Sequence, residues 1–144
     1  MKRNVRGFTL VDILIVVIIL GILAAIVIPQ FTNASTDARN NSIATTLQTI
    51  RGQIELFKIQ HGDQLPGITG GWTIMLTKTN TLDLTGSGVA TGVFGPYLQN
   101  APVNPANGMS AIGASASTAV GWVWNTSDGS IKAVSTNGTA VLTY

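Results

Sequence analysis

The sequence predicts an α+β protein in which a long N-terminal helix packs on a small C-terminal antiparallel sheet. Three observations lead to this fold class. Every side chain from Ile13 to Ile28 is apolar, apolar residues then recur at helical spacing over residues 43–57, and short alternating segments separated by turn residues fill 119–144. Helical periodicity followed by strand periodicity in one small chain is typical of an α+β domain.

The first element is a candidate membrane span. Residues 8–28 number 21, about the length that crosses the hydrocarbon core of a bilayer as a helix. The basic side chains Lys2, Arg3 and Arg6 precede it. By the positive-inside rule, this asymmetry places the N-terminus in the cytoplasm and the remainder of the chain on the other side of the membrane.

Two ordinary explanations of this start are weaker. A secretory signal needs a small-residue cleavage site after a shorter apolar core, whereas Ala24-Ala25 is followed by further apolar residues. A plain signal anchor accounts for the hydrophobicity and the Lys/Arg bias, but it gives no role to Gly7 or Asp12. A carboxylate inside a membrane costs roughly 3 kcal/mol, so Asp12 needs a partner, or a place near the interface where the helix dipole stabilises it.

The stretch Gly7-Phe8-Thr9-Leu10-Val11-Asp12 before a long apolar helix resembles the class III signal of type IV pilins and type II secretion pseudopilins. The resemblance implies that a prepilin peptidase removes residues 1–7 as a leader after Gly7 and that the new N-terminal Phe8 is N-methylated. Residues 8–28 would be retained as the transmembrane and assembly helix. Pro29 stands where this family often has a proline, and we expect it to kink the helix.

In the family the fifth mature residue is usually Glu, and here it is Asp12, which keeps the charge with one methylene less. The resemblance implies that this acid pairs with the N-terminal ammonium of a neighbouring subunit during filament assembly. The physical argument agrees, because a carboxylate and an amine attract strongly in low dielectric while either one alone is penalised there. Cleavage would create that amine on Phe8.

Composition limits the other functions. Without residues 1–7 the chain has five basic and six acidic side chains, so no basic patch suggests nucleic-acid binding. The chain has no cysteine, and a small exported domain without disulfides depends on its core or on neighbouring subunits. Many major pilins close a C-terminal loop with a disulfide, so its absence favours the pseudopilin branch of the resemblance.

The second half of the helix, residues 29–62, is predicted to be amphipathic. Its apolar residues recur at spacings of four and three and form one narrow stripe: Ile43, Leu47, Ile50, Ile54 and Phe57. Gly62 reads as the C-cap. A helix from Phe8 to Gln60 would be roughly 80 Å long, so its protruding half needs lipid first and neighbouring subunits after assembly.

Residues 63–118 form a loop-rich variable region. Trp72 to Leu76 fits a short helix or a strand equally well. The segment from Gly95-Pro96-Tyr97-Leu98 to Gly108 is punctuated by Pro and Asn-Gly. It resembles the segment that leads into the C-terminal sheet of G-type pseudopilins.

Residues 119–144 predict an antiparallel β-meander. The expected strands are Ala119–Trp124, Ser130–Ser135 and Thr139–Thr143, with Asn137-Gly138 as a two-residue hairpin turn. One sheet face should pack on the helix stripe. Val120, Trp122 and Trp124 share one face of the first strand. Either the tryptophans do that packing, or they form an exposed patch for subunit contact or adhesion.

The sequence offers no catalytic, metal or cofactor site. His61 is the sole histidine and cysteine is absent, so a zinc site or a Cys/His nucleophile is not available. G-type pseudopilins often bind calcium in a C-terminal loop. Only Asp128 lies near that place here, too few oxygens for a hard cation, and it fits a turn residue better.

The resemblance therefore implies a non-enzymatic structural subunit of a type II secretion pseudopilus, which polymerises through its N-terminal helix to drive protein export. A type IV pilus subunit, serving adhesion, twitching motility or DNA uptake, is the alternative. A membrane-anchored binding module that never polymerises is the rival of a different class. The implied partners are further copies of the chain, the prepilin peptidase, the assembly machinery and the bacterial inner membrane. The part of the chain after the membrane helix, called the head below, would lie in the periplasm. The filament would be periplasmic, or extracellular for a pilus.

Overall fold

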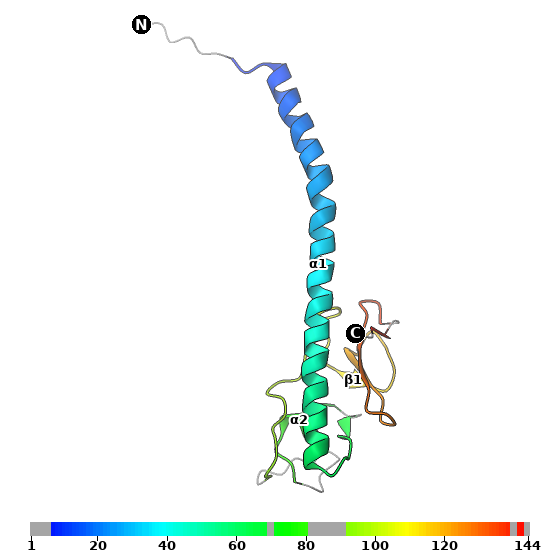
Figure 1. The fold of residues 1–144 in the computed structure, drawn as a ribbon. Helices are drawn as coiled ribbons and strands as arrows, with labels where there is room; N and C mark the ends of the chain where they lie inside the picture. The colour runs from blue at the N-terminus through cyan, green and yellow to red at the C-terminus, as the bar shows by residue number, and fades with distance from the viewer. Residues whose placement is uncertain (1–6, 69–70, 81–91, 139–140, 143–144) are drawn as a thin grey trace, which may run out of the picture. The chain divides into compact units, whose positions relative to one another are not determined.

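The computed structural model describes residues 7–68, 71–80, 92–138 and 141–142 of the 144. The chain divides into two compact units, Met1–Ala38 and Arg39–Tyr144. The described elements are the helices α1 (Leu10–Gln60) and α2 (Thr73–Leu76) and four strands, β1 (Ile112–Gly113), β2 (Trp122–Trp124), β3 (Ile131–Val134) and β4 (Val141–Leu142). The fold is the expected α+β arrangement of a long N-terminal helix and a small C-terminal sheet (Figure 1).

The first unit consists of the N-terminal part of α1. Each side chain from residue 7 to residue 38 is exposed, as expected for a helix that carries apolar residues on all sides and has no core of its own. Pro29 lies inside α1, and the helix continues beyond it. Because proline has no backbone N–H, one helical hydrogen bond is missing at this point. The kink at Pro29 stays a prediction.

In the second unit, the predicted stripe of α1 forms one side of the core. All five predicted residues are at most 2 % exposed: Ile43, Leu47, Ile50, Ile54 and Phe57. The helix ends as expected, because Gly62 takes a positive φ of 61° and the N–H of Asp63 reaches back to the carbonyl of Lys58 at 2.8 Å. This bond is the outer hydrogen bond of a Schellman motif.

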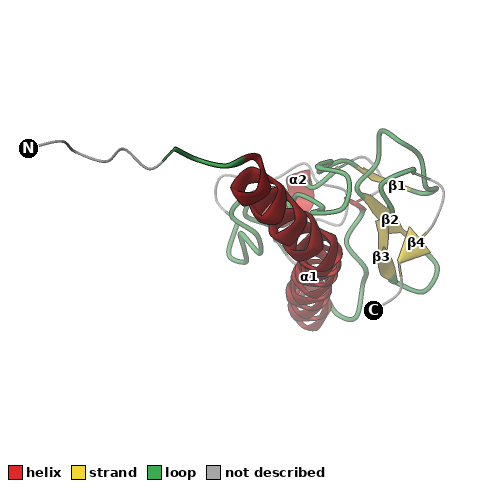
Figure 2. Cartoon of the chain, turned by 90° about the horizontal axis from the view of Figure 1, so that it is seen from above, coloured by secondary structure: helices red, strands yellow, loops and turns green. Residues whose placement is uncertain are grey.

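The four strands form one mixed sheet in the order β1-β2-β3-β4 (Figure 2). The two expected antiparallel pairings are present, between β2 and β3 and between β3 and β4. The sheet as a whole is mixed, because β1, a strand before residue 119 that the sequence did not predict, pairs in parallel with β2. Only Ile112 and Gly113 make up β1, and two residues are too short for a period-two pattern.

The connection between β3 and β4 is longer than the sequence predicted. Val134 pairs with Val141, so residues 135–140 connect the two strands. The turn closes where the N–H of Gly138 donates to the carbonyl of Ser135 at 3.0 Å, which places Thr136 and Asn137 at its centre. The two-residue hairpin at Asn137-Gly138 was therefore wrong. The expected last strand, Thr139–Thr143, lies partly outside the described residues.

The sheet packs its core face against α1. Trp122 and Trp124 are at most 1 % exposed and belong to the same apolar cluster as the α1 stripe. Arg51 adds a polar link, since its Nη2 donates to the carbonyl of Ile131 at 3.2 Å. Of the two alternatives for the tryptophans, core packing is confirmed and the exposed adhesive patch is wrong.

The loop-rich region contains one short helix and one isolated bridge. Residues 73–76 form α2, which settles the unassigned segment as a helix. Thr79 pairs with Phe94 in an antiparallel bridge. The stretch from residue 95 to 110 has no regular structure, but side chains from several parts of the head fix its course.

Asn104 holds this loop on the sheet. Its side chain is fully buried, and its Nδ2 donates to the carbonyls of Gly121 at 2.7 Å and Val134 at 2.8 Å. Its Oδ1 accepts from the N–H of Ala106 at 2.8 Å. Trp122 adds a bond from its Nε1 to the carbonyl of Pro102 at 2.8 Å. In a chain without cysteine, these buried bonds connect loop and sheet where other small exported domains use a disulfide.

Candidate functional site: the N-terminal segment

The candidate assembly segment is the apolar start of α1. This helix is long and apolar enough to cross a membrane, and none of the side chains in that stretch is buried within the protein. Burial of such a surface is favourable by about 25 cal/mol for each Å² removed from water. The segment therefore needs a lipid or protein environment.

Gly7 and Phe8 lie immediately before the helix. Residues 7–9 are outside α1, and among the described residues no heavy atom beyond those of the chain neighbours lies within 4 Å of the position of a Cβ on Gly7. The side chain of Phe8 is 73 % exposed. A peptide bond in exposed chain next to a helix start is accessible to a protease. Residues 1–6 of the expected leader lie outside the described residues.

Thr9 and Asp12 form a reciprocal cap at the helix start. The N–H and the Oγ1 of Thr9 donate to Oδ2 of Asp12 at 3.0 and 2.7 Å, and the N–H of Asp12 approaches Oγ1 of Thr9 at 3.3 Å. This is the capping-box pattern, in which the side chains of the N-cap and of the third helical residue satisfy each other's backbone donors. Sequence reasoning singled out Asp12 but missed Thr9, although the Thr-x-x-Asp spacing before an apolar run was a readable signal.

The cap uses only one oxygen of the Asp12 carboxylate. Both bonds from Thr9 end on Oδ2, and within the part of the chain that the structure describes Oδ1 accepts none. The carboxylate also lies at the N-terminal end of α1, where the helix dipole favours negative charge. Asp12 is thus held in place by Thr9 and keeps one oxygen available to a donor from another molecule.

The remaining polar candidates lie in the head and do not form a site. Among the described residues no three His, Cys, Asp or Glu side chains come together as metal ligands. Asp128 is exposed in the turn between β2 and β3, where its Oδ1 accepts from the N–H of Ser130 at 2.8 Å. Hydrogen bonding with the side chain and the backbone of Ser130 lowers the pKa of Asp128. This is usual for a carboxylate that caps its own turn.

His61 is a core residue at the end of α1. It is 2 % exposed, its ring stacks on that of Phe57 with centroids 3.8 Å apart, and its Nδ1 lies 2.9 Å from the Phe57 carbonyl. Phe94 and Tyr97 approach the same ring by their edges. The surroundings are aromatic, and no nucleophile or acid pairs with His61 among the described residues.

Comparison with known proteins agrees with the N-terminal motif. Residues 2–28 match the family model described as "Prokaryotic N-terminal methylation motif". The chain is 28 % identical over 81 residues to the type II secretion system core protein G of Dickeya chrysanthemi, a match that covers 56 % of this chain and 52 % of that protein. No solved structure matches the chain significantly.

Two further relatives have names that refer to fimbriae or to prepilin processing. The chain is 37 % identical over 87 residues to the type IV major fimbrial protein FimA of Dichelobacter nodosus, covering 60 % of this chain and 51 % of that protein. It is 34 % identical over 88 residues to the prepilin peptidase-dependent protein D of Escherichia coli, covering 61 % and 60 %. The matches therefore span about half the length of these curated relatives, or slightly more.

Proposed function

We propose that the chain is a structural, non-enzymatic subunit of a type II secretion pseudopilus, because its residues 2–28 match the methylation motif and its relatives include a type II secretion system core protein G. The subunit polymerises through the apolar part of α1, and the growing filament drives protein export. The observation that carries the proposal is the combination of a methylation motif at residues 2–28 with an apolar helix start whose described side chains are all exposed.

The N-terminal chemistry of the proposal has two steps. A prepilin peptidase cuts between Gly7 and Phe8 on the cytoplasmic side of the inner membrane, and the amine of Phe8 is methylated. This amine is positively charged at neutral pH, since an α-amino group has a pKa of about 7.7 to 8.0. Cleavage thus removes the leader and creates one cation at the end of the apolar helix.

The new cation can be the ionic partner of Asp12, which forms no ion pair with any residue that the structure describes. Oδ1 of Asp12 is not used by the Thr9 cap, so it can accept from the Phe8 ammonium of a neighbouring copy. In a low-dielectric environment such a pair is strongly attractive, whereas an unpaired charge there is costly. The pair therefore favours one register between neighbouring helices and opposes the others.

The choice of a pseudopilus over a pilus rests on the head. The head has no cysteine, and its Gly95–Gly108 segment resembles that of G-type pseudopilins. Several of the curated relatives are named type II secretion system core protein G. The type IV pilus subunit remains the second candidate, since FimA has the higher identity over a similar length.

The decisive experiment is to determine the N-terminus of the full chain purified from native membranes, by intact mass and peptide sequencing. The proposal expects a chain that begins at Phe8 with a methylated amine. A chain that still begins at Met1 in cells with an active prepilin peptidase would overturn it and favour the non-polymerising anchored module. Filaments outside the cell, seen by electron microscopy at native expression, would favour the pilus.

A further inference from the structure

The outward face of the sheet carries a small hollow. The strand register aligns Gly113, Val123 and Lys132 across β1, β2 and β3. Their neighbours along the strands are buried in the core, so these three residues lie on the opposite face. A Cβ built on Gly113 would lie 3.2 Å from Cγ2 of Val120, so Val120 covers this position and the hollow lies beside Val123 and Lys132.

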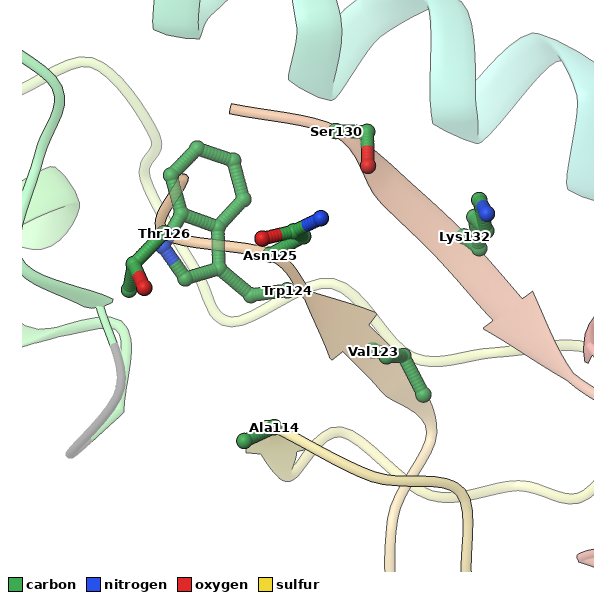
Figure 3. Close-up of a pocket in the computed structure, with 7 residues that line it drawn as sticks. All are labelled: Ala114, Val123, Trp124, Asn125, Thr126, Ser130 and Lys132. Atoms are coloured by element: carbon green, nitrogen blue, oxygen red, sulfur yellow. The ribbon is translucent and has the colours of Figure 1, made fainter. Parts of the chain in front are cut away.

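We call this feature the sheet hollow (Figure 3). It measures about 270 Å³. Its apolar side is formed by Ala114 and Val123, and its polar side by Asn125, Thr126, Ser130 and Lys132. Ligand pockets for small molecules run from about 300 to 1,000 Å³, so this hollow suits one or two protein side chains better than a cofactor.

Lys132 gives the hollow a positive charge. The ion pair found among the described residues is Lys58 with Glu55, so no described carboxylate contacts the Lys132 ammonium. Asp128 is close enough for its charge to interact with Lys132, but its Oδ1 is engaged by the N–H of Ser130. The hollow therefore combines an apolar surface with a cation that can take a further carboxylate.

A complementary surface lies on the first unit of the chain. Phe31, Ala34 and Asp37 follow one another at intervals of three on α1, so they lie along one side of the helix. We call these three residues the neck strip. Phe31 is 72 % exposed in a mostly polar segment beyond the apolar run. Asp37 is exposed and makes no ion pair with a described residue.

We propose that the neck strip of one copy docks in the sheet hollow of another copy. The ring of Phe31 packs against Ala114 and Val123, and the carboxylate of Asp37 lies beside the ammonium of Lys132. This inference rests on the proposed function, because polymerisation is what brings the copies together. A second copy is the favoured occupant because the two surfaces are opposite in charge and each contains an apolar group.

The contact is heterologous, since it joins two different surfaces. A heterologous contact leaves one free strip and one free hollow at the ends of every assembly, so it forms an open filament unless the rotation happens to close a ring. This property fits a polymer that grows by addition of subunits. The contact would also let the heads help to set the register between neighbouring subunits, which apolar helices alone specify weakly.

The test is a charge exchange in the full chain, expressed in its native host. Asp37→Lys and Lys132→Glu should each lower the amount of assembled filament, by about fivefold. The double variant should recover at least half of the wild-type amount, because it restores the pair with reversed signs. Lys78→Glu is the matched control, since it makes the same charge change at an exposed lysine outside the hollow, and it should assemble normally.

Further measurements keep the two proposals separable. Subunit abundance in membranes and thermal melting of the detergent-solubilised chain show whether each variant folds, and Phe31→Ser tests the apolar half independently. If the wild-type chain forms no filament, the proposed function fails and the contact fails with it. If the wild-type chain assembles but folded single variants assemble equally well, or the double variant does not recover, only the contact is overturned.

Discussion

The carboxylate of Asp12 accepts two hydrogen bonds from Thr9, and both end on the same oxygen, Oδ2. This geometry separates two roles of Asp12, capping of the helix and pairing with a cation. One oxygen completes the helix start, and the other can meet a cation from another subunit. The shorter Asp in place of the usual Glu completes the helix start, because its carboxylate is in contact with Thr9.

The first prediction separates these roles with Asp12→Asn. The amide oxygen of Asn can still accept from Thr9, so the helix start is retained, but the negative charge is lost. We expect filament yield to fall at least about tenfold, which corresponds to roughly 1.4 kcal/mol of lost pairing. Asp12→Glu should assemble like the wild type, and Asp63→Asn is the control for loss of an exposed charge outside α1.

Intact mass must show that the Asp12→Asn chain is still cleaved after Gly7 and methylated. If the processed variant assembles at the wild-type level, Asp12 does not pair with the Phe8 amine. The cap would then be its whole role.

The second prediction concerns Asn104. Replacement by Ala removes bonds to the buried carbonyls of Gly121 and Val134 and leaves both without these donors. The carbonyl of Gly121 keeps a second donor, the N–H of Val134 at 3.0 Å, so that carbonyl loses one bond without becoming unsatisfied. A lost hydrogen bond costs about 0.5 to 1.5 kcal/mol and an unsatisfied buried group about 1 to 3 kcal/mol, so we expect a loss of about 2 to 4 kcal/mol in the free energy of unfolding. Asn107→Ala is the comparison, since its Nδ2 makes one bond, to the carbonyl of Val120 at 2.9 Å. It should cost about 1 kcal/mol.

Urea denaturation of the detergent-solubilised chain, followed by tryptophan fluorescence, measures both values. Trp122 and Trp124 are buried beside the loop, so the signal reports on this region. Equal losses for the two variants would contradict a special role for Asn104.

The elements that could be predicted from the sequence are those with local signals. The stripe from Ile43 to Phe57 repeats at helical spacing, and all its members are buried. Gly62 could be assigned as a cap because positive φ favours glycine. The motif around Gly7 and Asp12 was equally local, so the candidate assembly residues were named without a structure.

The elements that were missed depend on contacts distant in sequence. β1 is a strand because Ile112 pairs with Trp122. Its two residues are too few to show a strand pattern in the sequence. Asn104 lies between prolines and reads as a turn residue, whereas its bonds reach residues 17 and 30 positions away. The sheet hollow likewise depends on the register of three strands. Local sequence patterns do not encode such pairings.

The third prediction concerns close approach at Gly121. A Cβ built on this residue would lie 2.1 Å from the carbonyl oxygen of Met109, and both groups are backbone or fixed to it. Gly121→Ala should therefore displace the 104–109 loop and cost about 1 to 3 kcal/mol. Gly52→Ala is the matched control, because Gly52 lies within α1 with open space around its Cβ position. It should stabilise the chain by about 0.5 to 1 kcal/mol. A stable Gly121→Ala variant would mean that the loop can move away without loss.

The last prediction is a pH dependence at Asp128. Its hydrogen bonds with Ser130, with a smaller contribution from the charge of Lys132, lower the pKa of the folded carboxyl below the ordinary value of an aspartate. A depressed folded pKa contributes stability above the unfolded pKa, and this contribution is lost as the pH falls through the folded pKa. Asp128→Asn should therefore be less stable than the wild type at pH 7, and the difference should shrink as the pH falls below about 4. Thermal melting of both chains from pH 7 to pH 2.5 measures the difference directly. A gap between the two melting temperatures that stays constant over this range would show that the carboxylate does not stabilise the β2–β3 turn through its charge.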